Sequence, residues 1–507
     1  MPGEPSINHQ ASTINPADLA ERVAELVADG ARLLTFVGTD DRPHGGGFGL
    51  HAMLLAADGR TVELDAELPA DDPRYPAITA RVPALHWDER ELRDLLGVVP
   101  EGHPDPRRLV LRRSWPDGLH PLRKDFDPAR APLPPRDDAF ACQVVEGHEV
   151  TQIPVGPIHA GIIEPGHFRL SAVGETVLHL DAQLFYTHRG IEKLAEGRTP
   201  SGALAVAERA CAACAVSHGV AFANALEGAL GIAAPPRASW GRTLLLELER
   251  LYNHLGDAGN MCSGGAFAVG AMAGAALKEL VQRRLERLVG HRFGRGAVAV
   301  GGLRRDLPPD ELAALRKELP HWRAEALRFR SLVLGSDGFV DRMRRTGVLR
   351  PELIQAFGGV GVLARASGVD QDLRRDRPYE RYRSLPLRVP GQAAGDAEAR
   401  FNQRLDEALV SLELLEELLE APPGGPIAGG IAAPKRLVAG VGAVESPRGA
   451  DVHWVRLAAD GTVDRLRIRS ASFANWPLVP LAVPGNLVPD FPMINKSFEL
   501  CYSCCDR

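Results

Sequence analysis

Two Cys-x-x-Cys pairs stand roughly three hundred residues apart, and the second lies at the carboxyl terminus. The first pair is Cys211 and Cys214, and the second is Cys501 and Cys504. A helical turn or a tight loop directs both sulfur atoms of such a pair toward one point. If the two pairs meet, they form a four-thiolate site that suits a soft metal ion. The chain must then bring the end of its fold back to its own middle.

Three ordinary kinds of four-cysteine site compete at this point. A pair of structural disulfides does not fit, because nothing in the sequence marks secretion and cytosolic thiols stay reduced. Closed zinc sites with four cysteines are common, but their cysteine pairs usually stand about 15–20 residues apart. An iron–sulfur cluster also accepts four thiolates, although the usual ferredoxin spacings are absent. The cysteines by themselves leave the zinc and iron–sulfur alternatives open.

Composition limits the function classes. The 507 residues exceed one average domain, and the net charge of −6 gives no reason to expect a nucleic-acid partner. We interpret an Arg/Tyr-rich stretch, residues 373–388, as a solvated or subunit-facing helix end. The uncharged residues 258–277 match a bilayer in length, but their glycines and alanines favour a helix packed closely inside the protein. Without a secretory signal, we expect a soluble, cytoplasmic chain.

The pattern predicts an α+β protein with two domains. Residues 1–126 alternate a helix (16–29) with strands at 33–37, 49–56 and 61–68, and then a charged helix at 87–97. Residues 127–140 form a proline-rich linker. Residues 141–507 begin with strands over 150–180, become mainly helical from residue 200, and return to strands at 438–444, 453–457 and 463–468. We therefore expect a small α/β domain followed by a large, mainly helical domain with small β regions.

Several blocks, in order, resemble the large subunit of the group 4 nickel–iron hydrogenases, the membrane-associated group that includes formate hydrogenlyase. Arg209, Cys211, Cys214 and His218 match that family's amino-terminal signature, and Cys501, Cys504 and Arg507 match its carboxyl-terminal one. The supporting blocks are Gly156-Pro157-Ile158-His159, Glu164-Pro165-Gly166-His167, His188-Arg189-Gly190-Ile191-Glu192, Asn253-His254-Leu255-Gly256-Asp257, Arg365-Ala366-Ser367-Gly368, Ser446-Pro447-Arg448-Gly449 and Ser472-Phe473-Ala474-Asn475. The similarity covers nearly everything after residue 145. The family shares ancestry with the 49 kDa subunit of complex I, which has lost the four cysteines.

The amino-terminal region resembles the 30 kDa subunit of complex I, which formate-hydrogenlyase-type enzymes carry fused ahead of the catalytic domain. Its matching residues are 87–97, 102–105 and 120–126. The resemblance implies a docking element without chemistry of its own. We therefore expect this region to bind partner subunits, and the cysteine site to form without it.

The resemblance also implies a ligand set and cofactors. Cys211 and Cys501 would be terminal ligands of nickel, while Cys214 and Cys504 would bridge nickel and iron. The iron would carry carbon monoxide and cyanide ligands, which require maturation factors, and we also consider a magnesium ion near the carboxyl terminus. Cys505 lies one residue beyond the motif and has no ligand role, and the isolated Cys142 and Cys262 are interpreted as buried small hydrophobic residues.

The resemblance further assigns roles beyond the cysteines. Glu164 would carry protons and Arg448 would lie over the open metal position, whereas Arg209 and His218 would orient ligands or bind the cofactor's diatomic groups. Three features depart from the family pattern: Ala212 replaces a glycine, Glu499-Leu500 replaces an Asp-Pro, and the chain stops at Arg507 without the usual removable tail. We expect either a mature form or a chain with no encoded tail.

These resemblances predict the catalytic large subunit of a membrane-associated hydrogenase that interconverts dihydrogen with protons and electrons. The chain has no iron–sulfur motif of its own, so electrons would pass to a small subunit with a 4Fe–4S cluster. Other hydrogenase or complex I-like subunits, including membrane subunits, would hold the chain at the cytoplasmic face of the membrane. The alternative is a non-hydrogenase electron-transfer or structural subunit of a complex I-like assembly.

Overall fold

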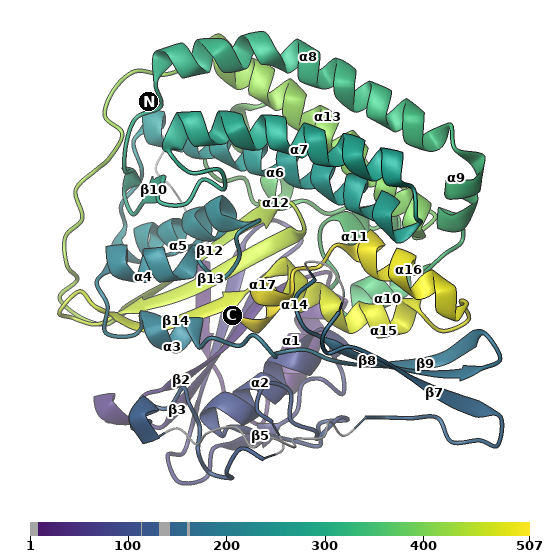
Figure 1. Ribbon diagram of the computed structural model, residues 1–507. Helices are drawn as coiled ribbons and strands as arrows, with labels where there is room; N and C mark the ends of the chain where they lie inside the picture. Colours follow the sequence, from purple (N-terminus) through teal and green to yellow (C-terminus); the bar gives the residue numbers. More distant parts are fainter. Residues whose placement is uncertain (1–8, 113, 131–141, 160–162) are drawn as a thin grey trace.

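The computed structural model describes residues 9–112, 114–130, 142–159 and 163–507. The architecture is α+β, as predicted from the sequence pattern. A four-helix layer lies at one side, an amino-terminal sheet at the opposite side, and the carboxyl-terminal segments fill the space between them (Figure 1). Among the described residues, no helix is both long and apolar enough to span a bilayer.

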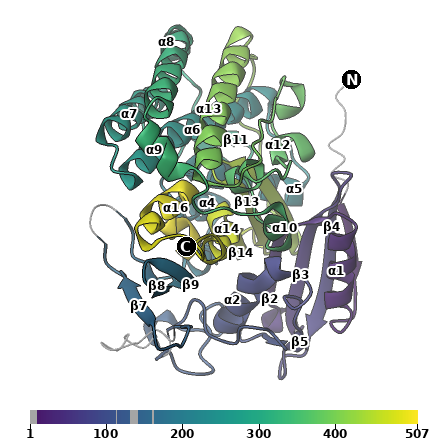
Figure 2. The same ribbon diagram turned by 90° about the vertical axis from the view of Figure 1, so that its right-hand side faces the viewer.

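The amino-terminal region is built on a four-stranded sheet of order β1-β4-β3-β2, in which β1 runs parallel to β4 and the other pairs are antiparallel. Its elements are β1 His9–Thr13, α1 Leu19–Ala28, β2 Arg32–Asp40, β3 Phe48–Leu55, β4 Thr61–Leu68, β5 Arg74–Pro76, α2 His86–Leu96 and β6 Val99–Glu101. Helix α1 covers the outer side of the sheet (Figure 2). The predicted helix 16–29, the three predicted strands and the charged helix 87–97 are all present.

The sheet is buried on both faces, which explains the unbroken apolar run of β3. Leu50 and Leu54 share a core with α1 and α2, while Met53 and Leu55 pack with Val452 and Trp454 of the large region. Alternate residues of a strand point to opposite faces, so both sets must be apolar. The amino-terminal region is therefore docked against the rest of its own chain.

The large region combines a helical bundle with two three-stranded sheets. Its strands are β7 Val150–Val155, β8 His167–Val173, β9 Thr176–Gln183, β10 Val298–Ala299, β11 Gly302–Leu303, β12 Val438–Ser446, β13 Gly449–Leu457 and β14 Val463–Arg469. Its helices are α3 Ile191–Ala195, α4 Pro200–Ala207, α5 Ala215–Leu230, α6 Pro236–Gly264, α7 Ala268–Val289, α8 Pro309–Leu334, α9 Asp337–Met343, α10 Pro351–Ala356, α11 Val362–Ala366, α12 Leu373–Asp376, α13 Ala397–Glu420, α14 Ala471–Asn475, α15 Val479–Ala482, α16 Phe491–Phe498 and α17 Tyr502–Asp506. The predicted linker lies largely outside the described residues; the part that is described forms a single 3₁₀ turn, Pro128–Arg130.

Helix α5 lies directly on the sheet β12-β13-β14 because two glycines of β12 leave room for its backbone. A Cβ at Gly440 would stand 2.2 Å from the carbonyl oxygen of Ala225, and one at Gly442 would stand 2.0 Å from that of Ala221. A side chain at either position would push the helix away from the sheet. This close contact fixes the amino-terminal end of α5, where the first cysteine pair lies.

Residues 258–277 do not form the single small-residue helix that we predicted. Helix α6 ends at Gly264, Ala266 adopts a left-handed φ of 59°, and α7 begins at Ala268, so the stretch is a helical hairpin. The small residues serve the hairpin, since Gly259 and Gly274 let the two helices meet backbone to backbone. A Cβ built on Gly274 would stand 2.5 Å from the Cα of Gly259.

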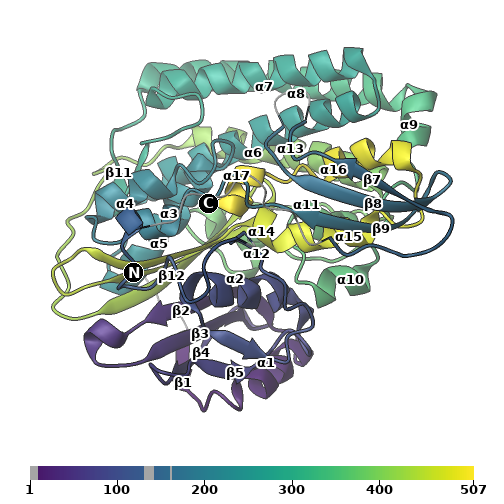
Figure 3. The ribbon, with the colours of Figure 1, turned by 60° about the horizontal axis from the view of Figure 1, so that its bottom comes forward.

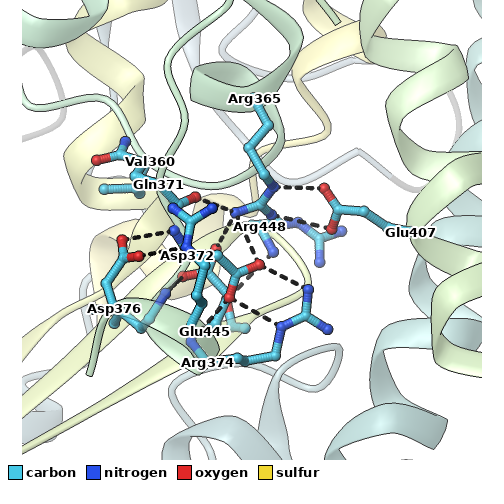
Figure 4. A network of polar contacts seen from close by, with 12 residues as sticks. Val360, Arg365, Gln371, Asp372, Arg374, Asp376, Glu407, Glu445 and Arg448 are labelled. Carbon is cyan, nitrogen blue, oxygen red and sulfur yellow. Dashed lines mark hydrogen bonds and ion pairs between the residues drawn. The ribbon is translucent and has the colours of Figure 1, made fainter. Parts of the chain in front are cut away.

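Residues 373–388 are a solvated helix end only in part, which corrects our interpretation. Arg374 and Tyr382 are almost completely buried, at 1% and 2% exposure. Figure 4 shows the reason, because the arginines of this region face carboxylates inside the protein. Arg374 pairs with Asp372 at 2.8 Å, and Arg365 pairs with Glu407 and Glu445, each at 2.8 Å. Burial alone would raise the pKa of Glu407, but Arg365 and His254 hold it well below its usual value.

We expect Gly274→Ala to destabilise the protein by about 1–3 kcal/mol, because the added methyl group must force α6 and α7 apart. The thermal unfolding midpoint should fall accordingly. Gly338 in α9 is a matched control, since its Cβ would meet no atom within 4 Å. Gly338→Ala should stabilise the protein by about 0.5–1 kcal/mol through helix propensity. Equal midpoints for the two variants would show that the glycine contact does not determine the packing.

Candidate metal centre

The two cysteine pairs meet at the centre of the molecule, close to the carboxyl terminus (Figure 3). The Sγ atoms of Cys211 and Cys501 are 3.3 Å apart, and those of Cys211, Cys214 and Cys504 all lie within 4.8 Å of one another. A disulfide would need about 2.05 Å, and all the cysteines are free. Three of the four are at most 2% exposed, while Cys501 is half-buried. The site is therefore a compact set of four thiols with access from one side.

Helix ends direct the sulfur atoms. Cys214 is the N-cap of α5, and Cys501 is the N-cap of the short α17, where its sulfur accepts a hydrogen bond from the backbone N–H of Cys504 at 3.3 Å. Free N–H groups at a helix start favour negative charge on a neighbouring sulfur. Both Cys-x-x-Cys pairs thus lie where the backbone itself stabilises thiolates.

The four thiols cannot all ionise on their own. Hydrogen bonds from Cys211 and Cys504 lower the pKa of Cys214 to about 7, whereas Cys211 raises the pKa of Cys501 to about 11. The hydrogen bonds with the other three cysteines also raise the pKa of Cys504. A first negative charge on the set thus opposes further ones. Metal ions bind thiolates and would supply the missing positive charge, so the donor set fits a thiophilic metal.

Arg448 is the fixed cation of the site. It lies in the turn between β12 and β13, and its Nη1 is 3.7 Å from the sulfur of Cys214. Its guanidinium donates to Asn253 at 2.9 Å and to Asp257 at 3.1 Å, and its Nε donates to the carbonyl of Glu499. Burial opposes the charge, but Asp257 and the cysteines raise the pKa of Arg448 well above its usual value.

A pair of neutral histidines lies behind Cys504. The Nε2 of His218 is 3.1 Å from the sulfur of Cys504, and its Nδ1 is 2.9 Å from the Nε2 of His453. Burial lowers the pKa of both rings, so both are neutral at pH 7. His453 then donates to His218, which in turn donates to the sulfur. The hydrogen-bond pattern agrees, since the Nδ1 of His453 has no partner among the described residues.

Glu164 lies at the half-buried edge of the site. Its carboxylate accepts a hydrogen bond from the backbone N–H of Ser503 at 2.7 Å, between the two cysteines of the second pair. Burial raises its pKa, and the charge of Cys501 raises it further. The carboxyl therefore keeps its proton to a higher pH than an exposed glutamate does.

Arg209 is exposed, and its guanidinium donates to the carbonyl of Ala205 in the preceding helix. No contact in the described part of the chain brings it to the sulfur atoms. Arg189 lies there instead: it donates to the carbonyls of Arg209, Ala210 and Ser503 at 2.8–3.0 Å. It therefore ties the loop of the first cysteine pair to that of the second. The block containing Arg189 was visible in the sequence, but its role depends on this long-range contact.

The sequence reasoning also missed the acidic groups that hold the cysteine helices. Glu249 accepts the backbone N–H groups of Val216 and Ser217 at 2.7 and 3.0 Å, and burial raises its pKa to about 8. Asp506 accepts the N–H groups of Phe185 and Thr187 at 2.9 and 3.0 Å. Both carboxylates bind backbone at the ends of cysteine-bearing helices. Their sequence neighbours gave no signal of this function.

Two of the departures from the family pattern have a structural explanation. Ala212 is not among the residues with positive φ, so the backbone does not need glycine at this position. Glu499 adopts a left-handed φ of 51° at the end of α16, and its side chain accepts a hydrogen bond from Asn260 at 2.7 Å. Burial and Asp257 raise the pKa of Glu499 to about 8.

The remaining cysteines lie apart from the four. Cys505 packs into the apolar core that also contains Phe473 and Trp476, and burial raises its thiol pKa. Cys262 is fully buried within α6, as predicted, whereas Cys142 is only half-buried. Cys142 follows the undescribed part of the linker and lies outside the apolar cores.

Family models match three parts of the chain. The 30 kDa subunit of respiratory-chain NADH dehydrogenase matches residues 12–132, and the 49 kDa subunit matches residues 265–436 and 427–507. Nickel-dependent hydrogenase matches residues 189–256, which include the first cysteine pair. The order of these matches agrees with the two regions predicted from the sequence.

Curated relatives cover nearly the whole chain. Formate hydrogenlyase subunit 5 of Escherichia coli strain K12 is 37% identical over 94% of this chain and 85% of its own length. Hydrogenase-4 component G of the same strain is 37% identical over 93% and 83%, respectively. A fused NADH-quinone oxidoreductase subunit of Bacteroides fragilis is 30% identical over 86% of each chain. The chain belongs to the family of group 4 hydrogenase large subunits in which a region like the complex I 30 kDa subunit is fused to one like its 49 kDa subunit.

Proposed function

We propose that this chain is the catalytic large subunit of a membrane-associated nickel–iron hydrogenase, which interconverts dihydrogen with protons and electrons. One observation carries the proposal: four cysteine sulfurs from distant parts of the chain converge in a buried site beside Arg448. Family membership alone would not carry it, because the family extends to NADH-quinone oxidoreductase subunits.

Cys211, Cys214, Cys501 and Cys504 would hold nickel and iron. When bound, these metals would supply the redox chemistry that cleaves and forms dihydrogen. Carbon monoxide and cyanide on the iron are not encoded by the chain, so maturation factors would deliver them. The guanidinium of Arg448 and the neutral ring of His218 would orient the site by holding sulfur and adjacent ligands in place.

A magnesium ion near the carboxyl terminus is not needed in this proposal. The carboxylates of Glu91 and Glu192, beside the terminus, accept hydrogen bonds from the guanidinium of Arg507 at 2.7 and 3.1 Å. Arginine thus already supplies positive charge between them, and a second cation would have to displace it.

Glu164 would carry protons between the site and solvent. It is half-buried, is held by the backbone of Ser503, and has a raised pKa because of burial and Cys501. A carboxyl whose pKa moves toward neutrality can both give and take a proton under working conditions. Its location beside Cys501, the more accessible cysteine, suits this role.

Electrons would leave through a partner. Only seven cysteines are present, and the three outside the site (Cys142, Cys262 and Cys505) cannot together ligate an iron–sulfur cluster of four thiolates. We infer a small subunit with a 4Fe–4S cluster, together with further hydrogenase or complex I-like subunits. These partners would hold the chain at the cytoplasmic face of the membrane.

The alternative is an electron-transfer or structural subunit of a complex I-like assembly. The 30% identity with an NADH-quinone oxidoreductase subunit favours it, as does the match to the 30 kDa and 49 kDa models. The nickel and iron content of the purified complex separates the two functions. Absence of nickel from active complexes would favour the alternative.

We expect serine in place of any one of the four cysteines to abolish hydrogen uptake and evolution and to lower the nickel content, because a hydroxyl is a poor ligand for a soft metal. Cys505→Ser is the matched control, since Cys505 lies in the same helix but in the apolar core. Hydrogenase assays and metal analysis of the purified complex provide the measurement. Loss at Cys505 with retention at Cys504 would show that the ligand register is wrong.

We expect Glu164→Gln to slow hydrogen–deuterium exchange by orders of magnitude while nickel and iron still bind. Glutamine can accept the same hydrogen bond from Ser503, but it cannot release or take up a proton. Since the raised pKa keeps the wild-type carboxyl protonated to higher pH than usual, Glu164→Asp should retain partial activity with a changed pH profile. Exchange close to the wild-type rate in Glu164→Gln would exclude Glu164 as the principal proton carrier.

A further inference from the structure

Helix α2 of the amino-terminal region carries two carboxylates that the rest of the chain buries. Asp88 and Glu91 lie three residues apart, on one face of the helix, and are 2% and 3% exposed. Glu91 pairs with Arg467 of β14 and with Arg507, both at 2.7 Å. Asp88 pairs with Arg467 at 2.8 Å and with Arg469 at 3.4 Å. The charged face of α2 is thus an intramolecular contact.

These contacts belong to a buried cluster in which arginines outnumber carboxylates. Four guanidinium groups, those of Arg465, Arg467, Arg469 and Arg507, share the carboxylates of Asp88, Glu91 and Glu192. Each of these arginines is at most 3% exposed. If α2 were absent, Glu192 would be the only one of the three carboxylates left to face all four. Buried charges without partners are strongly unfavourable, so the arginines could not stay in place.

The cluster is connected directly to the second cysteine pair. Arg507 follows α17, and its backbone N–H donates to the carbonyl of Ser503 at 3.0 Å, between Cys501 and Cys504. Its guanidinium lies 4.6 Å from the ring centre of Phe473, which in turn contacts Trp87 of α2 at 5.6 Å. A displacement of Arg507 would therefore move the helix that holds Cys504.

We propose that α2 of the amino-terminal region holds the carboxyl-terminal half of the cysteine site, with Asp88 and Glu91 as positioning residues acting through Arg507 and Arg467. This assigns the region a second role beside the binding of partner subunits. It also reverses our expectation that the site forms without this region. The inference deepens the proposed function, but it concerns the geometry of the thiols and holds whichever metal they bind.

The test compares thiol protection in the full-length, metal-free chain. Cys501 and Cys504 are alkylated with iodoacetamide, and the labelling rate of each is read by mass spectrometry. Glu91→Gln keeps the shape of the side chain but removes its charge, so we expect labelling of Cys504 to rise about tenfold or more through local opening. Cys142, which lies away from this cluster, should label at the wild-type rate. Glu101→Gln is the matched control, because Glu101 lies on β6 of the same region with its side chain 56% exposed.

A second comparison separates positioning from general loss of stability. In an Arg507→Gln background the pair is already broken, so Glu91→Gln should raise Cys504 labelling by no more than about twofold. Glu91→Asp retains the charge and should lie between the wild type and Glu91→Gln; it also serves if Glu91→Gln does not fold.

Wild-type labelling of Cys504 in both Glu91 variants would overturn the inference, as would an equal rise in Glu101→Gln. An undiminished effect of Glu91→Gln in the Arg507→Gln background would also overturn it. Failure of the proposed function is a different result: nickel would be missing from the wild-type complex while the labelling differences persisted. The two ideas can therefore fail separately.

Discussion

The pairing of buried arginines with buried carboxylates is the interaction on which the rest of this structure depends. Arg365 and Arg374 fix the helices and turns behind the site, Arg448 fixes the hairpin over the cysteines, and Arg507 fixes the carboxyl terminus. A guanidinium group can be buried only when carboxylates or carbonyls surround it. Each pair therefore specifies one arrangement of segments that lie far apart in the sequence, and together they bring residue 501 to residue 211.

The cysteine site itself has the opposite character. Four thiols lie together with Arg448 as the cation among them, and their pKa values move apart because a first thiolate opposes a second. The surrounding structure keeps the sulfur atoms close in spite of this repulsion. Such a set is completed by a bound metal, which is why the site supports a metal-dependent function better than a structural one.

Local pattern was sufficient for most of the secondary structure and for the cysteine register. The strands at 33–37, 49–56 and 61–68 follow from short apolar runs, the helix at 87–97 ends at a glycine, and the structure confirms all four. The errors arise where contacts over long distances decide. The small residues 258–277 permit one helix or a hairpin, and the choice depends on Gly259 meeting Gly274. Within residues 373–388, Arg374 is buried because it pairs with Asp372 and Glu247.

The sequence by itself determined which atoms can form the site: two cysteine pairs, a glutamate in a Pro/Gly loop, and an arginine in a turn. Their spacing is a local property and is visible without a fold. Only the tertiary structure decided that Arg189, rather than Arg209, bridges the two cysteine loops, and that the charged face of α2 meets Arg507 instead of solvent. A charged side chain carries no mark of its partner in the sequence, because burial and pairing are set by the packing of the whole chain.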